Sequence, residues 1–429
     1  MCIEEIYDLF ISVNQKISTD TRNILSNSIF FALKGEKFNG NAFAEEAILK
    51  GAKYSVVDET SYKTSENIIL VEDVLKCLQD LALFHRKRLS IPIIGITGSN
   101  GKTTTKELIL KVLSEKFKTV STKGNLNNHI GVPLTILSIL PEHQIAIVEM
   151  GANHPNEIDF LCRIAQPTFG IITNIGKAHL EGFGNIEGVI KTKTELYRFL
   201  KEVNGKVFIN VNDDLLNTHA KELEKISYGT SSDAYCEGKI IENFPFLKIE
   251  WRHNGASNIT KTNLYGTYNF PNIMAAICIG LYFNLENTQI NRALEEYIPN
   301  NNRSQIIEKN NHTIILDAYN ANPSSMREAI VSFSKLKTKN KLCILGDMLE
   351  LGKESICEHQ NIIQLLQEVG LNNAILVGSI FSSINTEPYL HFKDYKEAGT
   401  YLSELNSKKL SLLIKGSRGI KLENILEYL

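Results

Sequence analysis

Residues 91–105 read Ile91-Pro-Ile-Ile-Gly-Ile-Thr-Gly-Ser-Asn-Gly-Lys-Thr-Thr-Thr105, and this stretch decides the fold. Its apolar first half predicts a buried strand of a parallel sheet. The segment from Ser99 to Phe117 has the apolar spacing of a helix. A glycine-rich turn between a strand and a helix presents backbone N–H groups and a helix N-terminus to an anion. The stretch therefore predicts an α/β unit with a phosphate-binding loop.

The polar residues of this loop have distinct expected roles. Lys102 would contact the β- and γ-phosphates of ATP, and the Thr103 hydroxyl would bind Mg²⁺. The standard pattern has a further glycine five residues before Gly101, where this sequence has Ile96. The sequence thus matches a TGxNGKT variant, and the alternative is a chance glycine turn before a helix. The loop residues expected to bind ATP are Gly98, Ser99, Asn100, Gly101, Lys102, Thr103 and Thr104.

Strand and helix patterns continue on both sides of the loop. Between residues 89 and 298, the apolar segments IAIVEM, TFGIITN and KVFINVN alternate with helical segments, which predicts a mostly parallel, doubly wound sheet. The more polar stretch near 230–262 predicts an antiparallel excursion that includes LKIEW. A helix is expected to begin near Pro271.

The two flanking regions have α/β patterns of their own. In the first region, SIFFALKG and YSVVDE are strand-like and enclose a helical segment. In the last region, the strand-like segments are TIILDAY, KLCILGD, NAILVG and SLLIKGS. A chain of 429 residues is long enough for about three domains of roughly 150 residues. We therefore predict an α/β protein with a small N-terminal domain (1–88), a central phosphate-loop domain (89–298) and a C-terminal Rossmann-like domain (299–429).

Composition excludes several classes of protein. Hydrophobic residues make up 43% and charged residues 22%, which is globular and not disordered. Lys plus Arg is 46 against 48 for Asp plus Glu, so a nucleic-acid partner is not expected. The seven cysteines are scattered without a CxxC pair, so neither a disulfide framework nor a zinc site is indicated. An acidic N-terminus and the lack of an apolar run near ~18 residues indicate a soluble, cytoplasmic protein without membrane insertion.

Two polar residues follow predicted strands of the central region. Glu149 ends IAIVEM, where a carboxylate is well placed to bind a metal ion, although an ordinary strand-end acid is equally consistent with the pattern. His179 follows TFGIITN, and a lone loop histidine is more often a surface residue than a ligand.

Lys193 lies on the apolar stripe of a predicted helix over 186–200, whereas Lys191 and Glu195 fall off that stripe. A lysine on the inward face of a helix must pair, extend its ammonium to solvent or change its charge. The stripe alone favours a side chain that extends its ammonium to solvent.

Nine segments together resemble the Mur ligase family. In chain order they are TGSNGKTTTKE, GNLNNHIGVPLTIL, EMGANHPNEI, TNIGKAHLEGFG, KTKTE, GTYNFPNIMAA, DAYNANPSSM, LGDMLELG and IKGSRG. The resemblance extends from Asp20-Thr-Arg22 to Lys415-Gly-Ser-Arg418. DAYNANPSSM and LGDMLELG are similar to the family members that add a dipeptide, and the DNPR motif of a member that adds one amino acid is absent. Folylpolyglutamate synthetases share the phosphate loop but not the NANPxSM block.

This resemblance implies an activity. It implies an ATP-dependent ligase that joins D-alanyl-D-alanine to UDP-N-acetylmuramoyl-tripeptide through an acyl phosphate, with Mg²⁺, a CO₂-derived carbamate on Lys193 and a monomeric chain. Three alternatives stay open: a related ligase that adds a single amino acid, a folylpolyglutamate-synthetase-like ligase, and a nucleotide switch that uses the same loop. Whether the third residue of the tripeptide is diaminopimelate or lysine is not determined by the sequence.

The resemblance also implies roles for individual residues. The implied catalytic residues are Lys102, Lys193, His179 and Glu149, and the implied metal ligands are Thr103, Glu149, His179 and Lys193. Further implied nucleotide contacts are Asn269, Asn272, Arg303 and Asp317. The implied substrate-binding residues are Thr21, Lys34, Asn127, Asn128, Tyr319, Asn322, Lys415 and Ser417. Two positions depart from the family pattern: Tyr268 replaces a histidine expected near adenine, and Thr21 replaces a serine.

Overall fold

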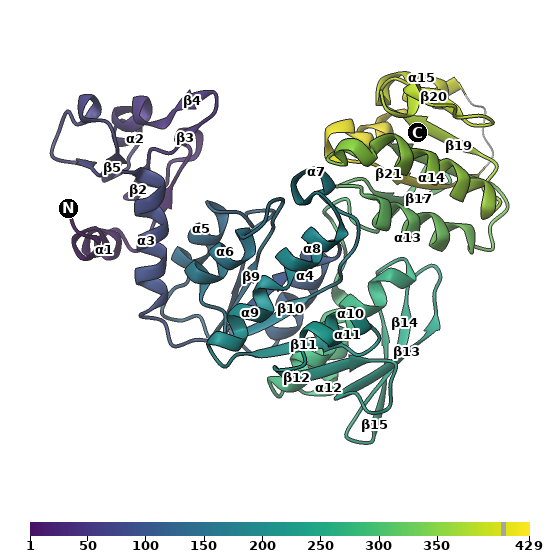
Figure 1. Cartoon of the computed structure of the whole chain (residues 1–429), viewed down its shortest axis with the longest axis horizontal. Coiled ribbons are helices and arrows are strands. Elements are labelled where there is room, and N and C mark those ends of the chain that lie inside the picture. Colours follow the sequence, from purple (N-terminus) through teal and green to yellow (C-terminus); the bar gives the residue numbers. More distant parts are fainter. Residues whose placement is uncertain (405–408) are drawn as a thin grey trace.

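The structure, a computed structural model, describes residues 1–404 and 409–429. Three sheets of four, nine and six strands form three α/β units, and a two-stranded ribbon accompanies the first unit. In Figure 1 the N-terminal unit and the C-terminal unit lie on opposite sides of the central unit. The predicted α/β class with parallel sheets is confirmed. Each large sheet takes its strands from one of the three predicted ranges, and the domain bounds themselves stay a prediction.

The N-terminal unit has a parallel sheet in the order β1-β2-β5-β6. Asp73 caps α3 by accepting the N–H of Lys76 at 2.8 Å. α3 packs against α5 (Gly131–Leu137) and α6 (Glu157–Ala165) of the central unit, and Arg86 Nε donates to Ala165 O at 3.0 Å. This helix therefore fastens the two units together. The elements are α1 (Ile3–Ser12), β1 (Ile17–Ser18), β2 (Ile29–Phe31), β3 (Lys34–Gly35), β4 (Phe38–Asn39), α2 (Ala44–Leu49), β5 (Tyr54–Val57), β6 (Ile68–Leu70) and α3 (Val74–Arg86).

The central sheet has the order β15-β14-β13-β12-β11-β10-β7-β9-β8. Its strands are parallel from β8 to β13, and β13, β14 and β15 pair antiparallel, which confirms the predicted excursion near 230–262. The strands are β7 (Ile93–Thr97), β8 (Thr119–Ser121), β9 (Ile145–Glu149), β10 (Phe169–Ile172), β11 (Lys206–Asn210), β12 (Glu224–Gly229), β13 (Cys236–Glu242), β14 (Lys248–His253) and β15 (Ala256–Lys261).

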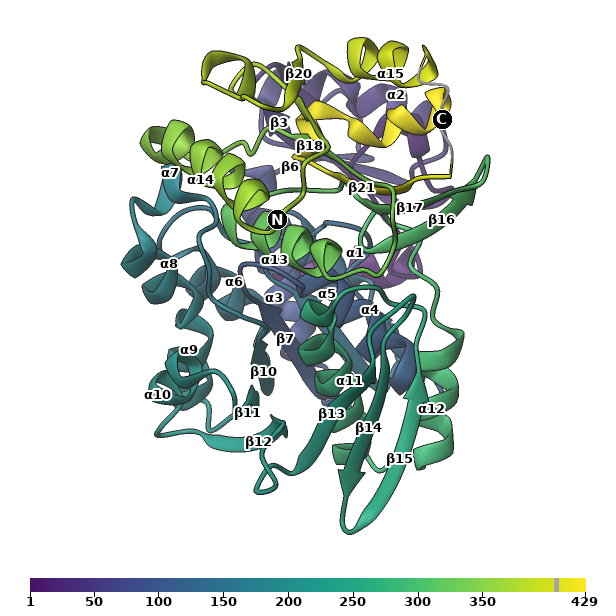
Figure 2. The ribbon, with the colours of Figure 1, turned by 90° about the vertical axis from the view of Figure 1, so that its right-hand side faces the viewer.

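Helices cover both faces of this sheet (Figure 2). They are α4 (Lys102–Leu113), α5 (Gly131–Leu137), α6 (Glu157–Ala165), α7 (Leu180–Phe183), α8 (Ile186–Lys193), α9 (Glu195–Glu202), α10 (Asp214–His219), α11 (Phe270–Tyr282) and α12 (Asn287–Glu296). Where one helix over 186–200 was predicted, α8 ends at Lys193 and α9 begins at Glu195. Lys193 is buried as its stripe position indicates, but Glu195, predicted off the stripe, is also buried.

The C-terminal sheet has the order β16-β17-β21-β18-β19-β20, with β16 and β17 antiparallel and the other neighbours parallel. The four strand-like segments predicted for this region form β17, β21, β18 and β19. The elements are β16 (Gln305–Lys309), β17 (His312–Asp317), α13 (Pro323–Ser334), β18 (Lys341–Gly346), α14 (Ser355–Glu368), β19 (Ala374–Val377), β20 (Leu390–Phe392), α15 (Tyr395–Glu404) and β21 (Ser411–Lys415). In the two described ranges, no helix has both the length and the hydropathy needed to cross a membrane.

Candidate active site

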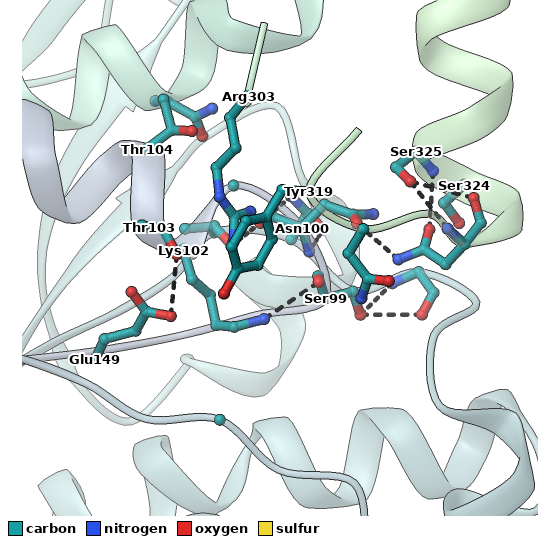
Figure 3. A pocket seen from close by; sticks show the side chains of 18 of the residues that line it. Ser99, Asn100, Lys102, Thr103, Thr104, Glu149, Arg303, Tyr319, Ser324 and Ser325 are labelled. Carbon is teal, nitrogen blue, oxygen red and sulfur yellow. Dashed lines mark hydrogen bonds between the residues drawn. The ribbon is translucent and has the colours of Figure 1, made fainter. Parts of the chain in front are cut away.

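A cleft of about 1100 Å³ lies where the central and C-terminal units meet. Its walls come from the phosphate loop, the segments that follow β9 and β10, the start of α11, and the strand ends of the C-terminal unit. Ligands of open α/β sheets bind at the carboxyl ends of strands, and this cleft is at that edge of both sheets. Figure 3 shows Arg303 and Tyr319 lying across the phosphate loop.

The phosphate loop is held by the segment that follows the neighbouring strand β10. Gly98 and Gly101 have φ of +143° and +78°, and an added Cβ at Gly98 would lie 2.0 Å from Thr173 Oγ1. Thr173 Oγ1 donates to Asn100 O at 2.5 Å, and Asn174 Oδ1 accepts the Asn100 N–H at 3.0 Å. Neither residue was among the candidate site residues predicted from the sequence. The available signal was their position after a strand that pairs with the loop strand.

Lys102 is the first residue of α4, and its ammonium turns back onto the loop. Lys102 Nζ donates to Gly98 O at 2.7 Å and to Ser99 O at 3.3 Å. Burial lowers the pKa of Lys102 to about 8, while Glu149 opposes this shift and Arg303 adds to it. A phosphate in the loop would give this lysine an anionic partner, which stabilises the ammonium more than carbonyl groups do.

Glu149, at the end of β9, is a carboxylate that suits a cation. It is 1% exposed, and its Oε1 accepts from Thr103 Oγ1 at 3.2 Å and Asn127 Nδ2 at 2.8 Å. Its Oε2 is buried and has no hydrogen-bond partner in the part of the chain that the structure describes. A buried anionic oxygen without a donor is costly unless a cation compensates it.

Magnesium fits this arrangement. Over residues 1–404 and 409–429, no three His, Cys, Asp or Glu side chains are grouped closely enough to hold a metal ion alone. Mg²⁺ commonly keeps several waters and takes one or two carboxylates together with substrate phosphates. Glu149 beside the Thr103 hydroxyl, at a loop suited to phosphate, matches that mode of binding.

His179 lines the same cleft, in a left-handed conformation with φ of +51°. Its Nδ1 lies 2.5 Å from Glu350 Oε2, which comes from the C-terminal unit. The contact with His179 holds the pKa of Glu350 below its ordinary value. Glu350 belongs to the LGDMLELG segment, so the structure brings this segment against TNIGKAHLEGFG of the central unit.

Lys193 does not line the cleft itself but contacts Ala152, which does. Lys193 Nζ donates to Ala152 O at 3.3 Å and lies 5.4 Å from the ring centroid of Phe183. Burial, with a contribution from the charge of Lys102, lowers the pKa of Lys193 well below its ordinary value. A depressed pKa favours the neutral amine, which is the form of lysine that acts as a nucleophile. The surroundings of Lys193 therefore fit the chemistry of carbamate formation.

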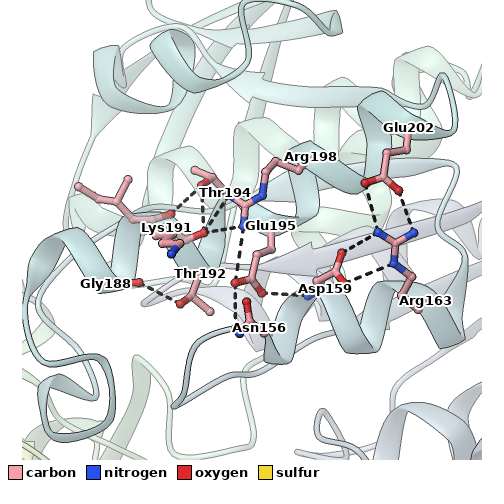
Figure 4. Close-up of polar contacts among 11 residues, drawn as sticks. Asn156, Asp159, Arg163, Gly188, Lys191, Thr192, Thr194, Glu195, Arg198 and Glu202 are labelled. Carbon is pink, nitrogen blue, oxygen red and sulfur yellow. Dashed lines mark hydrogen bonds and ion pairs between the residues drawn. The ribbon is translucent and has the colours of Figure 1, made fainter.

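Glu195 caps a helix that belongs to the same wall. Its carboxylate, 1% exposed, accepts the N–H groups of Asn156 and Asp159, both at 2.9 Å (Figure 4). These residues are the N-cap and the third residue of α6. Glu195 thus holds the start of α6, which continues the segment that contains Ala152.

The residues expected near adenine form one hydrogen-bonded group at the start of α11. Asn272 Nδ2 donates to Asn269 Oδ1 at 2.9 Å, and Asn269 Nδ2 donates to Ser304 Oγ at 3.1 Å. The Tyr268 hydroxyl lies 3.0 Å from the same Ser304 Oγ. Tyr268, which replaces the family histidine, therefore bonds to the C-terminal unit through Ser304.

Neighbouring strand ends of the C-terminal unit supply the opposite wall. Lys415 Nζ, at the end of β21, donates to Asp317 Oδ2 at 2.6 Å, at the end of β17. The Arg303 guanidinium lies 3.9 Å from the ring centroid of Tyr319. Asn322 Nδ2 donates to Asn100 Oδ1 at 2.7 Å, so the DAYNANPSSM segment contacts the phosphate loop directly.

Some candidate residues lie apart from the cleft or serve the fold. Lys34 pairs with Asp58 at 2.8 Å in the N-terminal unit, which also contains Thr21. Ser417 is buried, and its Oγ accepts the Leu349 N–H at 2.9 Å. Thr21, Lys34, Lys193 and Ser417 are not among the residues that line the cleft, whereas Asn127 and Asn128 are.

The fold and this cleft define an α/β protein with a phosphate loop and a C-terminal unit that meets it. The chain matches three family models: "Mur ligase family, catalytic domain" over residues 15–86, "Mur ligase middle domain" over 96–280 and "Mur ligase, glutamate ligase domain" over 302–418.

The UDP-N-acetylmuramoyl-tripeptide–D-alanyl-D-alanine ligase of Bacillus subtilis (strain 168) is 34% identical over 96% of this chain and 92% of its own. A crystal structure of MurF from Acinetobacter baumannii superposes with a TM-score of 0.87 at 32% identity and covers 96% of this chain and 92% of the other. MurF ligase from Thermotoga maritima in complex with ADP gives a TM-score of 0.86 at 26% identity and covers 98% and 97%. The chain belongs to the Mur ligase family.

Proposed function

We propose that the protein is an ATP-dependent ligase that joins D-alanyl-D-alanine to UDP-N-acetylmuramoyl-tripeptide in peptidoglycan synthesis. The observation that supports this most is the contact between Asn322 and Asn100, because it brings the segment resembling dipeptide-adding ligases onto the phosphate loop. The Bacillus subtilis relative, similar over nearly its whole length, is named for this reaction. The MurF structure from Thermotoga maritima contains ADP, which supports nucleotide use by this chain.

The proposed reaction has two steps. A carboxylate oxygen of the muramoyl peptide attacks the γ-phosphorus of ATP, which forms an acyl phosphate and releases ADP. The amine of D-alanyl-D-alanine then attacks the acyl carbon, loses a proton and expels inorganic phosphate. The main task of the protein is to hold two anionic reactants together, so positioning and charge neutralisation account for most of the catalysis.

The residues of the phosphate-loop wall would carry the first step. The loop N–H groups and the start of α4 would bind phosphate oxygens, and Lys102 would leave its carbonyl partners to contact the β- and γ-phosphates. Mg²⁺ would neutralise phosphate charge, and we propose Thr103, Glu149, His179 and the modified Lys193 as the residues that hold the metal ions.

We propose that CO₂ adds to the unprotonated amine of Lys193 and releases one proton. The resulting carbamate would place an anion where the neutral amine has one carbonyl partner, Ala152 O. Its burial and depressed pKa support this assignment. Its hydrogen-bond partner Ala152 lines the cleft, which places the amine next to the cleft wall.

The remaining candidate residues receive proposed binding roles. Asn269, Asn272, Arg303 and Asp317 would hold the base and the rest of the nucleotide. The residues proposed to bind the muramoyl peptide, the dipeptide or uridine are Thr21, Lys34, Asn127, Asn128, Tyr319, Asn322, Lys415 and Ser417. The separation of Thr21 and Lys34 from the cleft suits a long substrate whose uridine end binds the N-terminal unit.

Phosphate release tests the reaction class. We expect release only when ATP, a UDP-muramoyl-tripeptide and D-alanyl-D-alanine are all present, with the tripeptide supplied in its diaminopimelate and lysine forms. Slow release from ATP alone, unchanged by either peptide, would favour a nucleotide switch and contradict the proposal.

Acceptor selectivity tests the dipeptide assignment. The single-amino-acid ligase uses the arginine of DNPR to bind a carboxylate close to the attacking amine, whereas the dipeptide carboxylate lies one residue further out. A missing charged hydrogen bond costs roughly 1.5–3 kcal/mol, so kcat/KM for free D-alanine should be about one to two decades lower than for the dipeptide. A preference for D-alanine, L-lysine or diaminopimelate would assign the chain to a sister ligase.

A further inference from the structure

Lys106 is a fully buried lysine next to the proposed metal site, and none of the roles above uses it. It lies one turn after Lys102 in α4, and its side chain is 0% exposed. Its Nζ donates to Thr122 O at 2.7 Å and Gly124 O at 3.2 Å, and it lies 3.1 Å from Glu107 Oε1. Two of its three N–H donors therefore bond to carbonyl groups, and Glu107 supplies a nearby negative charge.

Lys106 also lies near Glu149 without bonding to it. The distance from Lys106 Nζ to Glu149 Oε2 is 3.8 Å, which is too long for a hydrogen bond but close for two charges. The ammonium therefore stabilises the carboxylate while Oε2 stays open to another ligand. A neutral side chain at position 106 would leave the buried carboxylate without this charge.

The carbonyl groups that Lys106 holds begin a segment that makes two hydrogen bonds to Glu149 and one to Gly151. Thr122 Oγ1 accepts the Glu149 N–H at 2.9 Å, and Asn127 Nδ2 donates to Glu149 Oε1 at 2.8 Å. Asn127 O accepts the Gly151 N–H at 2.8 Å. Lys106 thus joins the phosphate-loop helix to residues 122–130, and this segment in turn orients the carboxylate.

We propose that Lys106 is a positioning residue for the cation site: it clamps residues 122–130 against α4 and so fixes the Glu149 carboxylate in the wall of the cleft. This inference rests on the proposed metal-dependent function, but it concerns cation binding and not the identity of the acceptor. Lys106 is fully buried and is not among the residues that line the cleft, so we do not expect it to contact the nucleotide or the metal. Its effect passes through Thr122, Asn127 and Glu149.

Cation binding and amide exchange test the proposal without any ligation assay. Mn²⁺, detected by electron paramagnetic resonance in the presence of ADP, is the probe, and hydrogen exchange reports on residues 122–130. In Lys106→Met we expect at least about tenfold weaker Mn²⁺ binding, equivalent to about 1.4 kcal/mol, and faster exchange confined to 122–130 and 149–151. Lys111→Met is the matched control, because Lys111 lies on the same helix, is 38% exposed and pairs with Glu296. Both readouts should stay at wild-type values in that control.

A double variant separates positioning from general destabilisation. If Lys106 acts through the 122–130 segment, Lys106→Met combined with Asn127→Ala should weaken Mn²⁺ binding by less than the product of the single effects. Unchanged Mn²⁺ binding in Lys106→Met, tighter binding, or fully multiplicative effects would each overturn the proposal.

Should Lys106→Met fail to fold, Lys106→Gln replaces it. Gln keeps two N–H donors with a shorter reach, so the same changes are expected at smaller size, and wild-type values would contradict the proposal. Absence of ligation in the wild type would instead contradict only the proposed function.

Discussion

Two buried lysines of the central unit, Lys106 and Lys193, have very different surroundings. Lys106 donates to two carbonyl groups and has carboxylates at 3.1 and 3.8 Å. Lys193 has one carbonyl partner at 3.3 Å and an aromatic ring nearby, and burial lowers its pKa. The first environment supplies acceptors and negative charge to an ammonium, whereas burial disfavours an ammonium in the second. The comparison indicates that Lys106 acts as a fixed cation, whereas Lys193 is suited to covalent modification.

Substitution of Lys102 should give the largest loss of activity, with which the losses at Lys106 and Lys193 can be compared. It lies on the helix of Lys106 but bonds only to loop carbonyl groups that a phosphate can replace. We expect Lys102→Ala to lower kcat by about 10³-fold or more, because a group that stabilises transferred charge is lost. The melting temperature should stay unchanged, since the residue is half-buried and outside the apolar core. Near-normal ligation by this variant would contradict the phosphate-loop assignment.

Lys193→Ala tests whether Lys193 acts through the proposed carbamate. We expect a loss of about 10²-fold or more in kcat, with partial recovery when formate or acetate is added, since a small acid can supply the missing anion. Lys191→Ala, an exposed neighbour on the same helix, is the control and should retain activity. The activity of Lys106→Met should not recover with formate or acetate, because this variant has lost a positive charge that an added acid cannot supply.

Dialysis against CO₂-free buffer provides an independent measurement on the wild type. Activity should fall and return with bicarbonate. Full activity without CO₂, together with electron density for an unmodified Lys193, would remove the distinction between the two lysines.

The sequence predicts the features that depend on a local pattern. The apolar run before Gly98 predicts β7, and the stripe on which Lys193 lies predicts its burial, because both follow from the period of one element. Glu195 was missed because the helix breaks at Thr194, and this break changes which residues of α9 face inward. Thr173 and Asn174 contact the loop across neighbouring strands, and the partner of Lys106 is a segment reached only after β8. Such contacts depend on how separate elements pack, which the period of a single element does not specify.

Glu195→Gln tests how firmly the wall around Lys193 is held. The carboxylate accepts two backbone N–H groups, and an amide with one acceptor oxygen leaves one of these donors unpaired. We expect a loss of about 1–3 kcal/mol in the free energy of unfolding, measured by urea denaturation, and faster exchange at the start of α6. Glu202→Gln is a control drawn from the same cluster (Figure 4), since its partner Arg163 and Glu202 are both half-exposed. That control should change stability by less than about 1 kcal/mol. Equal losses of stability in the two variants would show that Glu195 contributes no more than an exposed ion pair does.

Glu350→Gln should have the smallest effect on activity. It tests whether catalysis near His179 and Lys193 depends on a residue of the C-terminal unit. Glu350 lies 2.5 Å from His179, but its side chain is 56% exposed, and exposed pairs contribute about 0.2–1 kcal/mol. We therefore expect kcat/KM to change by less than about fivefold, with unchanged ADP affinity in a calorimetric titration. Lys177→Met, which removes an ion pair between the central unit and Glu358 of the C-terminal unit, is the matched comparison. A loss of about 10²-fold in Glu350→Gln alone would mean that Glu350 acts on the reacting groups. In that case a carboxylate from the C-terminal unit would take part in the reaction near His179 and Lys193. At the phosphate loop, by contrast, Lys106 and Glu149 both come from the central unit.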